Sequence, residues 1–142
     1  MIRQATSTDL PAIRQLIVEL DYTPPDNLEA RFRQLTAHPD ELILVYEMNG
    51  EVVAFLSLHF IPQLAIAGDF ARISYFAVDA RARGKGVGRQ LEAEVTRLAR
   101  ERGCDRIEVH CHTRRTAAHR FYERQGYEES PKYLKKPLRA MR

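Results

Sequence analysis

The 142-residue sequence contains no tryptophan and only two cysteines, and it has no long apolar run. A helix that crosses a membrane needs about 20 consecutive apolar residues, so no membrane-spanning segment is predicted. The polar start, Met-Ile-Arg-Gln-Ala-Thr, is not that of a signal peptide. We therefore expect a cytoplasmic protein with no membrane partner.

The two cysteines, Cys104 and Cys111, are not expected to form a disulfide. They lie seven positions apart near and within one predicted strand, and an extended segment of that length spans about 23 Å. The Cα atoms of a disulfide lie about 4.4–6.8 Å apart, so a bridge would require the strand to fold back. Both thiols are predicted to be reduced.

The charge and composition are those of an ordinary globular protein. The net charge is +3, with 44% hydrophobic and 29% charged residues. This mild positive excess suits an anionic ligand, but it is too weak to predict a nucleic-acid partner. No repeat, low-complexity stretch or linker divides the chain, so residues 1–142 are predicted to form a single domain.

The apolar periodicity predicts an α/β fold with a mixed sheet and helices on its faces. Asn49-Gly50, between two β-rich runs, is a strong signal for a hairpin. The long helix in the middle of the chain would be a right-handed crossover if its flanking strands are parallel neighbours. Helices are predicted at about 9–20, 27–37, 87–102 and 116–125, and strands at 42–48, 51–60, 70–78, 106–111, 127–129 and 133–138.

The stretch from Ile73 to Arg89 combines a strand, a glycine-rich turn and the start of a helix. Glycines let the backbone approach a ligand closely, and the first N–H groups of a helix have no partner within it. The combination predicts a binding site for a phosphate. The glycines are Gly84, Gly86 and Gly88, and the surrounding cations are Arg81, Arg83, Lys85 and Arg89.

The spacing of these glycines excludes two common nucleotide sites. A dinucleotide fingerprint needs Gly-x-Gly-x-x-Gly, whereas this turn reads Gly-x-Gly-x-Gly. A Walker loop needs Ser or Thr after its lysine, whereas Lys85 is followed by Gly86. The predicted ligand is therefore a phosphate group of neither a dinucleotide site nor a Walker loop.

Two motifs resemble the GNAT superfamily of N-acetyltransferases. Arg83-Gly84-Lys85-Gly86-Val87-Gly88 is similar to the loop that holds the pyrophosphate of acyl-CoA in that family. Ala118-x-x-Phe121-Tyr122-x-x-x-Gly126-Tyr127 is similar to its Ala-x-x-Phe-Tyr-x-x-x-Gly-Phe motif. The motifs lie some thirty residues apart with a predicted strand between them, as in the family. The resemblance covers nearly the whole chain.

The resemblance implies a mostly antiparallel sheet with a central, splayed pair of parallel strands, and acetyl-CoA as cosubstrate. An amine would attack the thioester directly, and Tyr122 would protonate the departing thiolate. Arg115 stands where many members have an asparagine, so it would contact CoA in its place. The residues implied in binding CoA are Phe76, Ala77, Val78, Arg83, Gly84, Lys85, Gly86, Val87, Gly88, Arg89 and Arg115.

The resemblance leaves the general base open, because residues 72–78 contain no carboxylate where many relatives have Glu. Glu108, His110 and His112 share one face of a predicted strand, and His110 is preferred because imidazole titrates near neutral pH. A solvated surface is the alternative for this face. A metal is not expected, because neighbours on one strand rarely complete a site. Other candidates are Asp21, Tyr22 and Tyr75.

The acceptor is expected to be a small-molecule amine. The fragments at 50–53, 58–59 and 118–122 are similar to those of aminoalkylphosphonate N-acetyltransferases, although a polyamine, an amino acid or a protein N-terminus would also fit. A non-catalytic acyl-CoA-binding or regulatory module is the alternative function. Homodimers are common in the family, so a homodimer is one expected state.

Overall fold

The computed structural model describes residues 1–110, 115–130 and 134–139. His112, one of the candidate bases, and Cys111 lie outside the described residues. The chain divides into two compact units, Met1–Val109 and His110–Arg142, and each is described by itself. The single-domain organisation stays a prediction.

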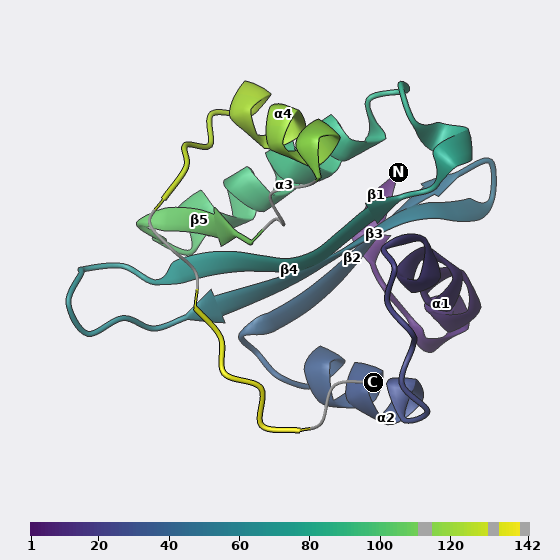
Figure 1. Ribbon diagram of the computed structural model, residues 1–142, viewed down its shortest axis with the longest axis horizontal. Coiled ribbons are helices and arrows are strands. Elements are labelled where there is room, and N and C mark those ends of the chain that lie inside the picture. The colour runs from purple at the N-terminus through teal and green to yellow at the C-terminus, as the bar shows by residue number, and fades with distance from the viewer. Residues whose placement is uncertain (111–114, 131–133, 140–142) are drawn as a thin grey trace. The chain divides into compact units, whose positions relative to one another are not determined.

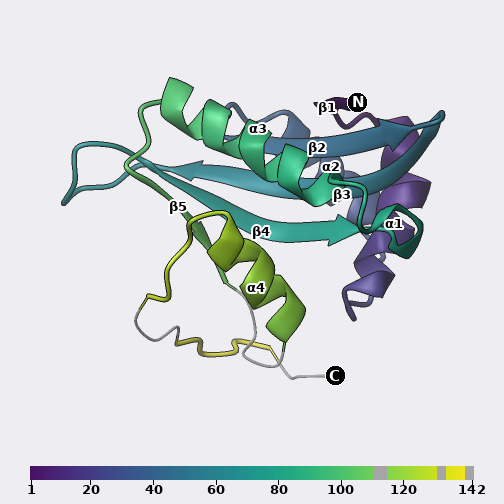
Figure 2. The ribbon, with the colours of Figure 1, turned by 90° about the horizontal axis from the view of Figure 1, so that it is seen from above.

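The first unit is built on one five-stranded sheet with the order β1-β2-β3-β4-β5 (Figures 1 and 2). Neighbouring strands are antiparallel except β4 and β5, which are parallel. This mixed sheet with helices confirms the predicted α/β class. The strands are β1 (Ile2–Gln4), β2 (Glu41–Met48), β3 (Glu51–Ile61), β4 (Phe70–Val78) and β5 (Arg106–Val109), and the helices are η1 (Ser7–Asp9), α1 (Leu10–Glu19), α2 (Leu28–Thr36), η2 (Ala80–Ala82) and α3 (Val87–Glu101).

Helices cover both faces of the sheet. Helix α3 packs on one face and α1 and α2 pack on the other (Figure 1). Leu56 and Leu91 are fully buried in the cluster on the α3 face, whereas Phe55 and Ile13 belong to the cluster on the α1 and α2 face. Strand β3 is therefore apolar on both sides, as expected for a strand that is covered twice.

The hairpin between β2 and β3 forms where Asn49-Gly50 predicted it. Both turn residues have positive φ, 54° for Asn49 and 80° for Gly50. Two such residues match the twist of the strands that they join, and Asn and Gly adopt this conformation at low cost. No helix in the described part of the chain is long and apolar enough to span a membrane.

The parallel pair formed by β4 and β5 is short. Within the described residues its ladder runs from Phe70↔Arg106 to Ile73↔Val109 and ends there. Directly after that point β4 carries a bulge, because Leu58 of β3 faces Ile73 while Ser57 faces Tyr75. A bulge bends its strand and increases the local twist. The second half of β4 thus continues beyond the end of its ladder with β5.

Two features of the sheet differ from the sequence prediction. Strand β1 was missed, because three residues are too short to show an alternating pattern and pair only with Leu44–Tyr46 of a distant strand. The strands predicted at 127–129 and 133–138 were wrong for the residues that the structure describes there. Leu134 and Leu138 are exposed rather than packed, and β propensity is realised only on a surface that is partly buried. Tyr133 itself lies outside the described residues.

The second unit contains one described helix, α4 (Thr116–Arg124). It begins and ends as the sequence predicted, and Gly126 follows it with a φ of 95°. A left-handed glycine at this position ends a helix without a Cβ clash.

Asp9 fastens the start of α1 to the sheet. Its carboxylate accepts a hydrogen bond from the Thr6 N–H at 2.7 Å, and the Arg3 guanidinium holds both oxygens at 2.8 and 2.9 Å. The Asp9 side chain is buried, and the Arg3 guanidinium lowers the pKa of this carboxyl. One carboxylate thereby connects β1 to the first helical turn.

We predict that Asp9→Asn lowers the free energy of unfolding at pH 7 by about 1–3 kcal/mol, because a buried charged hydrogen-bond network loses its anion. The folded pKa of Asp9 lies below its unfolded value of about 3.9. The stabilisation is therefore complete above that value and is lost as the pH falls through the folded pKa.

Urea unfolding of both proteins between pH 7 and pH 2 checks this prediction, with the exposed Glu19→Gln as control. The curves of wild type and Asp9→Asn should converge at the acid end, and the control should match wild type at neutral pH. Equal stability of the two proteins at pH 7 would contradict the prediction.

Candidate functional site

Hydrogen bonds of Asp79 hold the start of the connection from β4 to α3 in place. The Asp79 N–H donates to the Val53 carbonyl at 2.7 Å, and Asp79 Oδ1 accepts from the Arg81 N–H at 2.9 Å. The side chain thus caps η2, and the backbone remains attached to β3. The turn that follows, residues 83–86, begins from a defined position.

Two glycines shape this turn. Gly84 has a φ of 77° and Gly86 a φ of 79°, both in the left-handed region. A Cβ placed on Gly84 would meet no atom within 4 Å. The backbone conformation, rather than close packing, therefore requires glycine at this position. The space beside the turn remains open for a ligand to approach the backbone.

The turn presents a row of backbone N–H groups. Gly86 is the N-cap of α3, and the Gln90 N–H makes the first helical hydrogen bond, to the Gly86 carbonyl at 3.0 Å. Within the described part of the chain, no carbonyl accepts from the N–H groups of residues 84–89. With the positive end of the helix dipole behind them, these groups suit an anion, and we call them the anion site.

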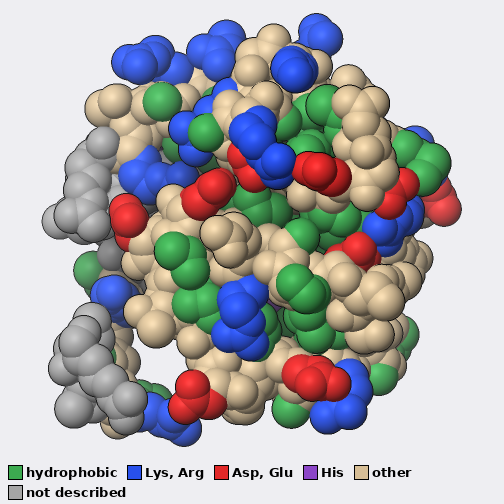
Figure 3. Space-filling model, turned by 90° about the vertical axis from the view of Figure 1, so that its right-hand side faces the viewer, with side chains coloured by type: hydrophobic (Ala, Val, Ile, Leu, Met, Phe, Trp, Pro, Cys, Tyr) green, Lys and Arg blue, Asp and Glu red, His purple; other side chains and the backbone are tan. Residues whose placement is uncertain are grey.

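The cations around the turn have two different roles. The Arg81 guanidinium binds Asp79 and Glu51, each at 3.0 Å, and these contacts raise its pKa. The sequence counted Arg81 with the ligand-facing cations, but the structure shows it holding the loop. Arg83, Lys85 and Arg89 are exposed. Figure 3 shows Lys and Arg side chains among the exposed residues of the face that it draws.

The end of β4 leads directly into this turn. Phe76, Ala77 and Val78 pair with β3 through Leu56, Phe55 and Ala54, in that order. Ala77 is buried on the α1 and α2 face, while Phe76 and Val78 pack toward α3. These three residues follow the bulge, on the part of β4 that extends past the ladder with β5. They form one continuous segment with the anion site.

The candidate bases predicted from the sequence fall in different environments. Both oxygens of Glu108 are engaged, one by Arg72 at 2.8 Å and the other by Arg106 at 3.0 Å. Glu108 therefore holds two arginines in place and is not open to an amine. His110 is exposed and belongs to the second unit.

The two tyrosines proposed as alternative bases contact each other. The rings of Tyr22 and Tyr75 meet edge to face at 5.3 Å, and burial raises the pKa of Tyr75. A phenol with a raised pKa keeps its proton at neutral pH, which argues against Tyr75 as the base. Asp21 is exposed at the end of α1, with a φ of 66°.

Sequence reasoning missed a chain of polar side chains on the sheet. His59 Nδ1 contacts the Glu41 carboxylate, and His59 Nε2 lies 2.6 Å from the Ser74 hydroxyl. A histidine inside the mostly apolar strand β3 was the available signal. Its partners come from two other strands, so the cluster emerges only from the strand register.

In the second unit, Tyr122 lies half-buried on α4 between two aromatic rings. The Phe121 and Tyr127 rings each meet it at a centroid distance of 5.3 Å. Arg115 is exposed and stands at the N-cap position of α4. The motif residues that the sequence singled out thus share one helix and the turn after it.

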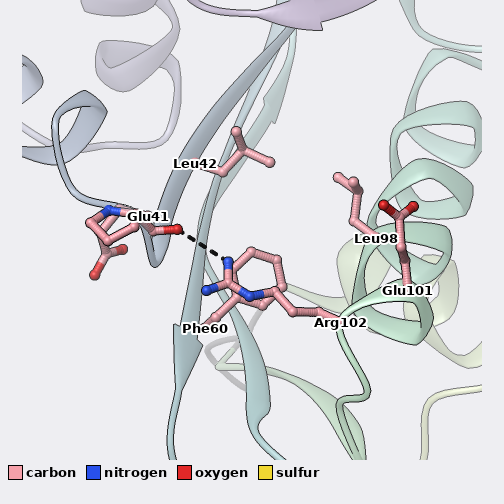
Figure 4. A pocket seen from close by; sticks show the side chains of 7 residues that line it. Glu41, Leu42, Phe60, Leu98, Glu101 and Arg102 are labelled. Carbon is pink, nitrogen blue, oxygen red and sulfur yellow. Dashed lines mark hydrogen bonds between the residues drawn. The ribbon is translucent and has the colours of Figure 1, made fainter.

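A shallow recess of about 240 Å³ lies at the opposite end of α3 from the anion site (Figure 4). Arg102 crosses it, donating to the Pro39 carbonyl at 3.2 Å and stacking over the Phe60 ring at 4.1 Å. Leu42 and Leu98 form its apolar wall. These contacts fasten the end of α3 to the start of β2.

Comparison with known proteins identifies the family. The model of the acetyltransferase (GNAT) family matches residues 10–127 of this chain. The chain belongs to the acetyltransferase (GNAT) family. The match spans both the anion site and the helix that carries Tyr122, and members of this family generally use acetyl-CoA.

Named relatives of this GNAT protein are N-acetyltransferases. The aminoalkylphosphonate N-acetyltransferase of Salmonella typhimurium is 34% identical over 131 residues, which cover 91% of this chain and 85% of that protein. Glucosamine 6-phosphate N-acetyltransferase 1 of Oryza sativa is 31% identical over 124 residues, covering 80% and 72%. The prediction of an N-acetyltransferase, rather than a non-catalytic module, is confirmed.

Solved structures share this fold over nearly the whole chain. A putative acetyltransferase from Agrobacterium tumefaciens str. C58 superposes with a TM-score of 0.87 at 26% identity, covering 97% of this chain and 99% of that one. A transcriptional regulator from Bacillus halodurans C-125 superposes with a TM-score of 0.90 at 28% identity. The alignment covers 97% of this chain and 99% of that one.

Proposed function

We propose that this GNAT enzyme uses acetyl-CoA and transfers its acetyl group to the primary amine of a small molecule. The anion site carries the proposal. Its N–H groups at residues 84–89 have no acceptor in the described part of the chain, and Arg83, Lys85 and Arg89 lie exposed around them. Such a site suits the pyrophosphate of CoA, which carries several anionic oxygens.

The pantetheine arm would then follow β4. Phe76, Ala77 and Val78 immediately precede the anion site, and beyond the bulge β4 extends past its ladder with β5. Backbone groups along this edge suit the amides of pantetheine. A backbone N–H near Val78 would polarise the thioester carbonyl, where negative charge develops in the tetrahedral intermediate.

The chemical step is a direct attack of the free amine on the thioester carbon. An amine with a pKa of about 10.4 must lose its proton first, which costs about 4–5 kcal/mol at neutral pH, at about 1.4 kcal/mol per pKa unit. A base is therefore needed. Tyr122 would protonate the departing thiolate, and Arg115 would contact CoA. Homodimerisation and a cytoplasmic location stay predictions.

The acceptor that we favour is an aminoalkylphosphonate. The relative of this name is 34% identical, and the rice relative acts on an amine that carries a phosphate. Both acceptors combine an amine with a phosphorus oxyanion, which suits a chain with a net charge of +3.

The test is release of CoA thiol from acetyl-CoA with a panel of amines: 2-aminoethylphosphonate, glucosamine 6-phosphate, an aminoglycoside, a polyamine and a peptide with a free N-terminus. We expect the highest kcat/KM with 2-aminoethylphosphonate. Turnover of another amine class without turnover of 2-aminoethylphosphonate would overturn the acceptor assignment. Binding of acetyl-CoA without turnover of any amine would overturn the proposed reaction.

Gly86→Val is predicted to weaken acetyl-CoA binding at least tenfold, because its branched side chain would crowd the N–H groups of the turn. Gly103→Val is the matched control, since Gly103 has nearly the same φ, 75° against 79°, but follows the opposite end of α3. Both variants should lose similar stability, about 1–2 kcal/mol, from the left-handed backbone. Calorimetric titration with acetyl-CoA separates them, and equal affinity of the two variants would refute the assignment of the turn.

Tyr122→Phe is predicted to lower kcat about 100-fold with little change in acetyl-CoA affinity, as expected for the loss of a general acid. Tyr127→Phe is the matched control, because its ring contacts Tyr122 from the same unit. Steady-state kinetics between pH 6 and pH 10 check the prediction. Wild-type kcat in Tyr122→Phe across this range would remove Tyr122 from the mechanism.

A further inference from the structure

Hydrogen bonds connect Glu41, His59 and Ser74 on the sheet face that α1 and α2 cover. Glu41 faces His59 across the β2–β3 ladder, so the two side chains project from the same face. On β2, Glu41 shares this face with Ile43 and Val45, which belong to the cluster under α1 and α2. In Figure 4 the Glu41 carboxylate lies on the far side of β2 from α3.

The contact with Glu41 sets which nitrogen of His59 carries the proton. A carboxylate accepts hydrogen bonds only, so Nδ1 of the neutral imidazole donates to Glu41. Nε2 is then the acceptor, and the Ser74 hydroxyl at 2.6 Å donates to it in preference to the Ser57 carbonyl, which lies farther away at 3.5 Å. The order carboxylate, imidazole, hydroxyl is the arrangement in which a histidine can withdraw a proton from a hydroxyl group.

Ser74 occupies a special position on β4. It is the extra residue of the bulge, and it directly follows Ile73, where the described ladder with β5 ends. Bulges re-aim side chains and are common next to active sites. Ser74 is exposed, and it lies two residues before Phe76, or about 7 Å along the strand. The Ser74 hydroxyl, at the exposed end of this chain of hydrogen bonds, is therefore close to the segment that would hold the pantetheine arm.

We propose that Glu41, His59 and Ser74 are the proton relay that deprotonates the acceptor amine. The proposal rests on the acetyl transfer proposed above. The ammonium group gives a proton to the Ser74 oxygen while the Ser74 proton passes to His59 Nε2. The imidazolium that forms is stabilised by the Glu41 carboxylate.

The free amine then forms the new C–N bond at the thioester carbon, and the C–S bond breaks. The attacking nitrogen then carries a second proton, which it loses as the departing thiolate takes up a proton through Tyr122. The products are the amide and the CoA thiol, and the first proton passes from the His59 imidazolium to solvent. Ser74 is the catalytic residue, because its hydroxyl touches the amine. His59 and Glu41 act through it as positioning residues. No acetyl group is transferred to Ser74.

The other charged groups near His59 are already paired with each other. Arg72 of β4 faces His59 across the ladder, and its guanidinium binds Glu108 of β5 at 2.8 Å. Within the described residues, Glu41 is the carboxylate that contacts the imidazole. The relay should therefore depend on Glu41 more than on Arg72 or Glu108.

The kinetic test compares Ser74→Ala, His59→Gln and Glu41→Gln with wild type, using the amine that wild type turns over best and His38→Gln, a change in an exposed histidine, as control. We expect kcat to fall about 100-fold in His59→Gln at pH 7, with unchanged KM for acetyl-CoA. The deficit should shrink toward pH 10, where the amine loses its proton unaided. A purely structural role would give a loss that does not change with pH.

Rates within about twofold of wild type in His59→Gln and Ser74→Ala at pH 7 would overturn the relay, as would an acetylated Ser74 found by mass spectrometry after incubation with acetyl-CoA alone. A second readout does not need turnover. The ¹⁵N signals of the His59 ring should show the proton on Nδ1 in wild type and a different distribution of the proton between the two ring nitrogens in Glu41→Gln. A proton on Nε2 of the neutral imidazole in wild type would overturn the relay. Failure of the proposed reaction is recognised separately, because wild type would then release no CoA with any amine.

Discussion

The candidate site depends on the backbone N–H groups at the start of α3, which need a hydrogen-bond acceptor from outside the helix. A helix leaves its first N–H groups without partners, and this chain offers them no acceptor within its described residues. The left-handed conformations of Gly84 and Gly86 turn the chain sharply enough to keep these groups at the surface. Asp79 and Arg81 fix the entry to the turn, so the N–H groups are oriented before any anion arrives.

Strand β4 connects the anion site to the bulge at Ser74, where we propose that the acceptor amine loses its proton. Its first four residues pair with β5 and its last residues lead into the turn, with the bulge at Ser74 between the two parts. The same bulge aims Ser74 at His59 and ends the described pairing with β5. The bulge thereby lies between two parts of the proposed site. Residues 76–78, which would bind pantetheine, follow it, and the polar cluster of Glu41, His59 and Ser74 lies on the sheet face that α3 does not cover. In the proposed reaction, the amine would meet the thioester along this strand.

The features that could be predicted from the sequence are those with local signals. Asn49-Gly50 predicts its hairpin, because two left-handed residues are required there. The glycines of the turn predict the anion site for a similar reason, and the apolar stripes predict α1 and α3. The assignment to acetyl transfer came from two spaced motifs and was confirmed by the family match.

Features that depend on contacts between distant residues could not be predicted in this way. Strand β1 is too short to carry a pattern and exists because β2 pairs with it. Glu41 and His59 are 18 positions apart, and their contact follows only from the register of β2 on β3. Glu108 looked like a base because its strand neighbours are histidines, but Arg72 and Arg106 occupy both of its oxygens.

The central claim is that the N–H groups of residues 84–89 bind the pyrophosphate of CoA, and amide NMR during titration with CoA tests it most directly. Charge-assisted hydrogen bonds to phosphate should move the amide protons of this turn strongly downfield and slow their exchange with water, with much smaller changes around Gly103 at the opposite end of α3. The account predicts that these amides show the largest shifts in the protein. It would be contradicted if CoA bound while the amide protons of residues 84–89 stayed at their free positions.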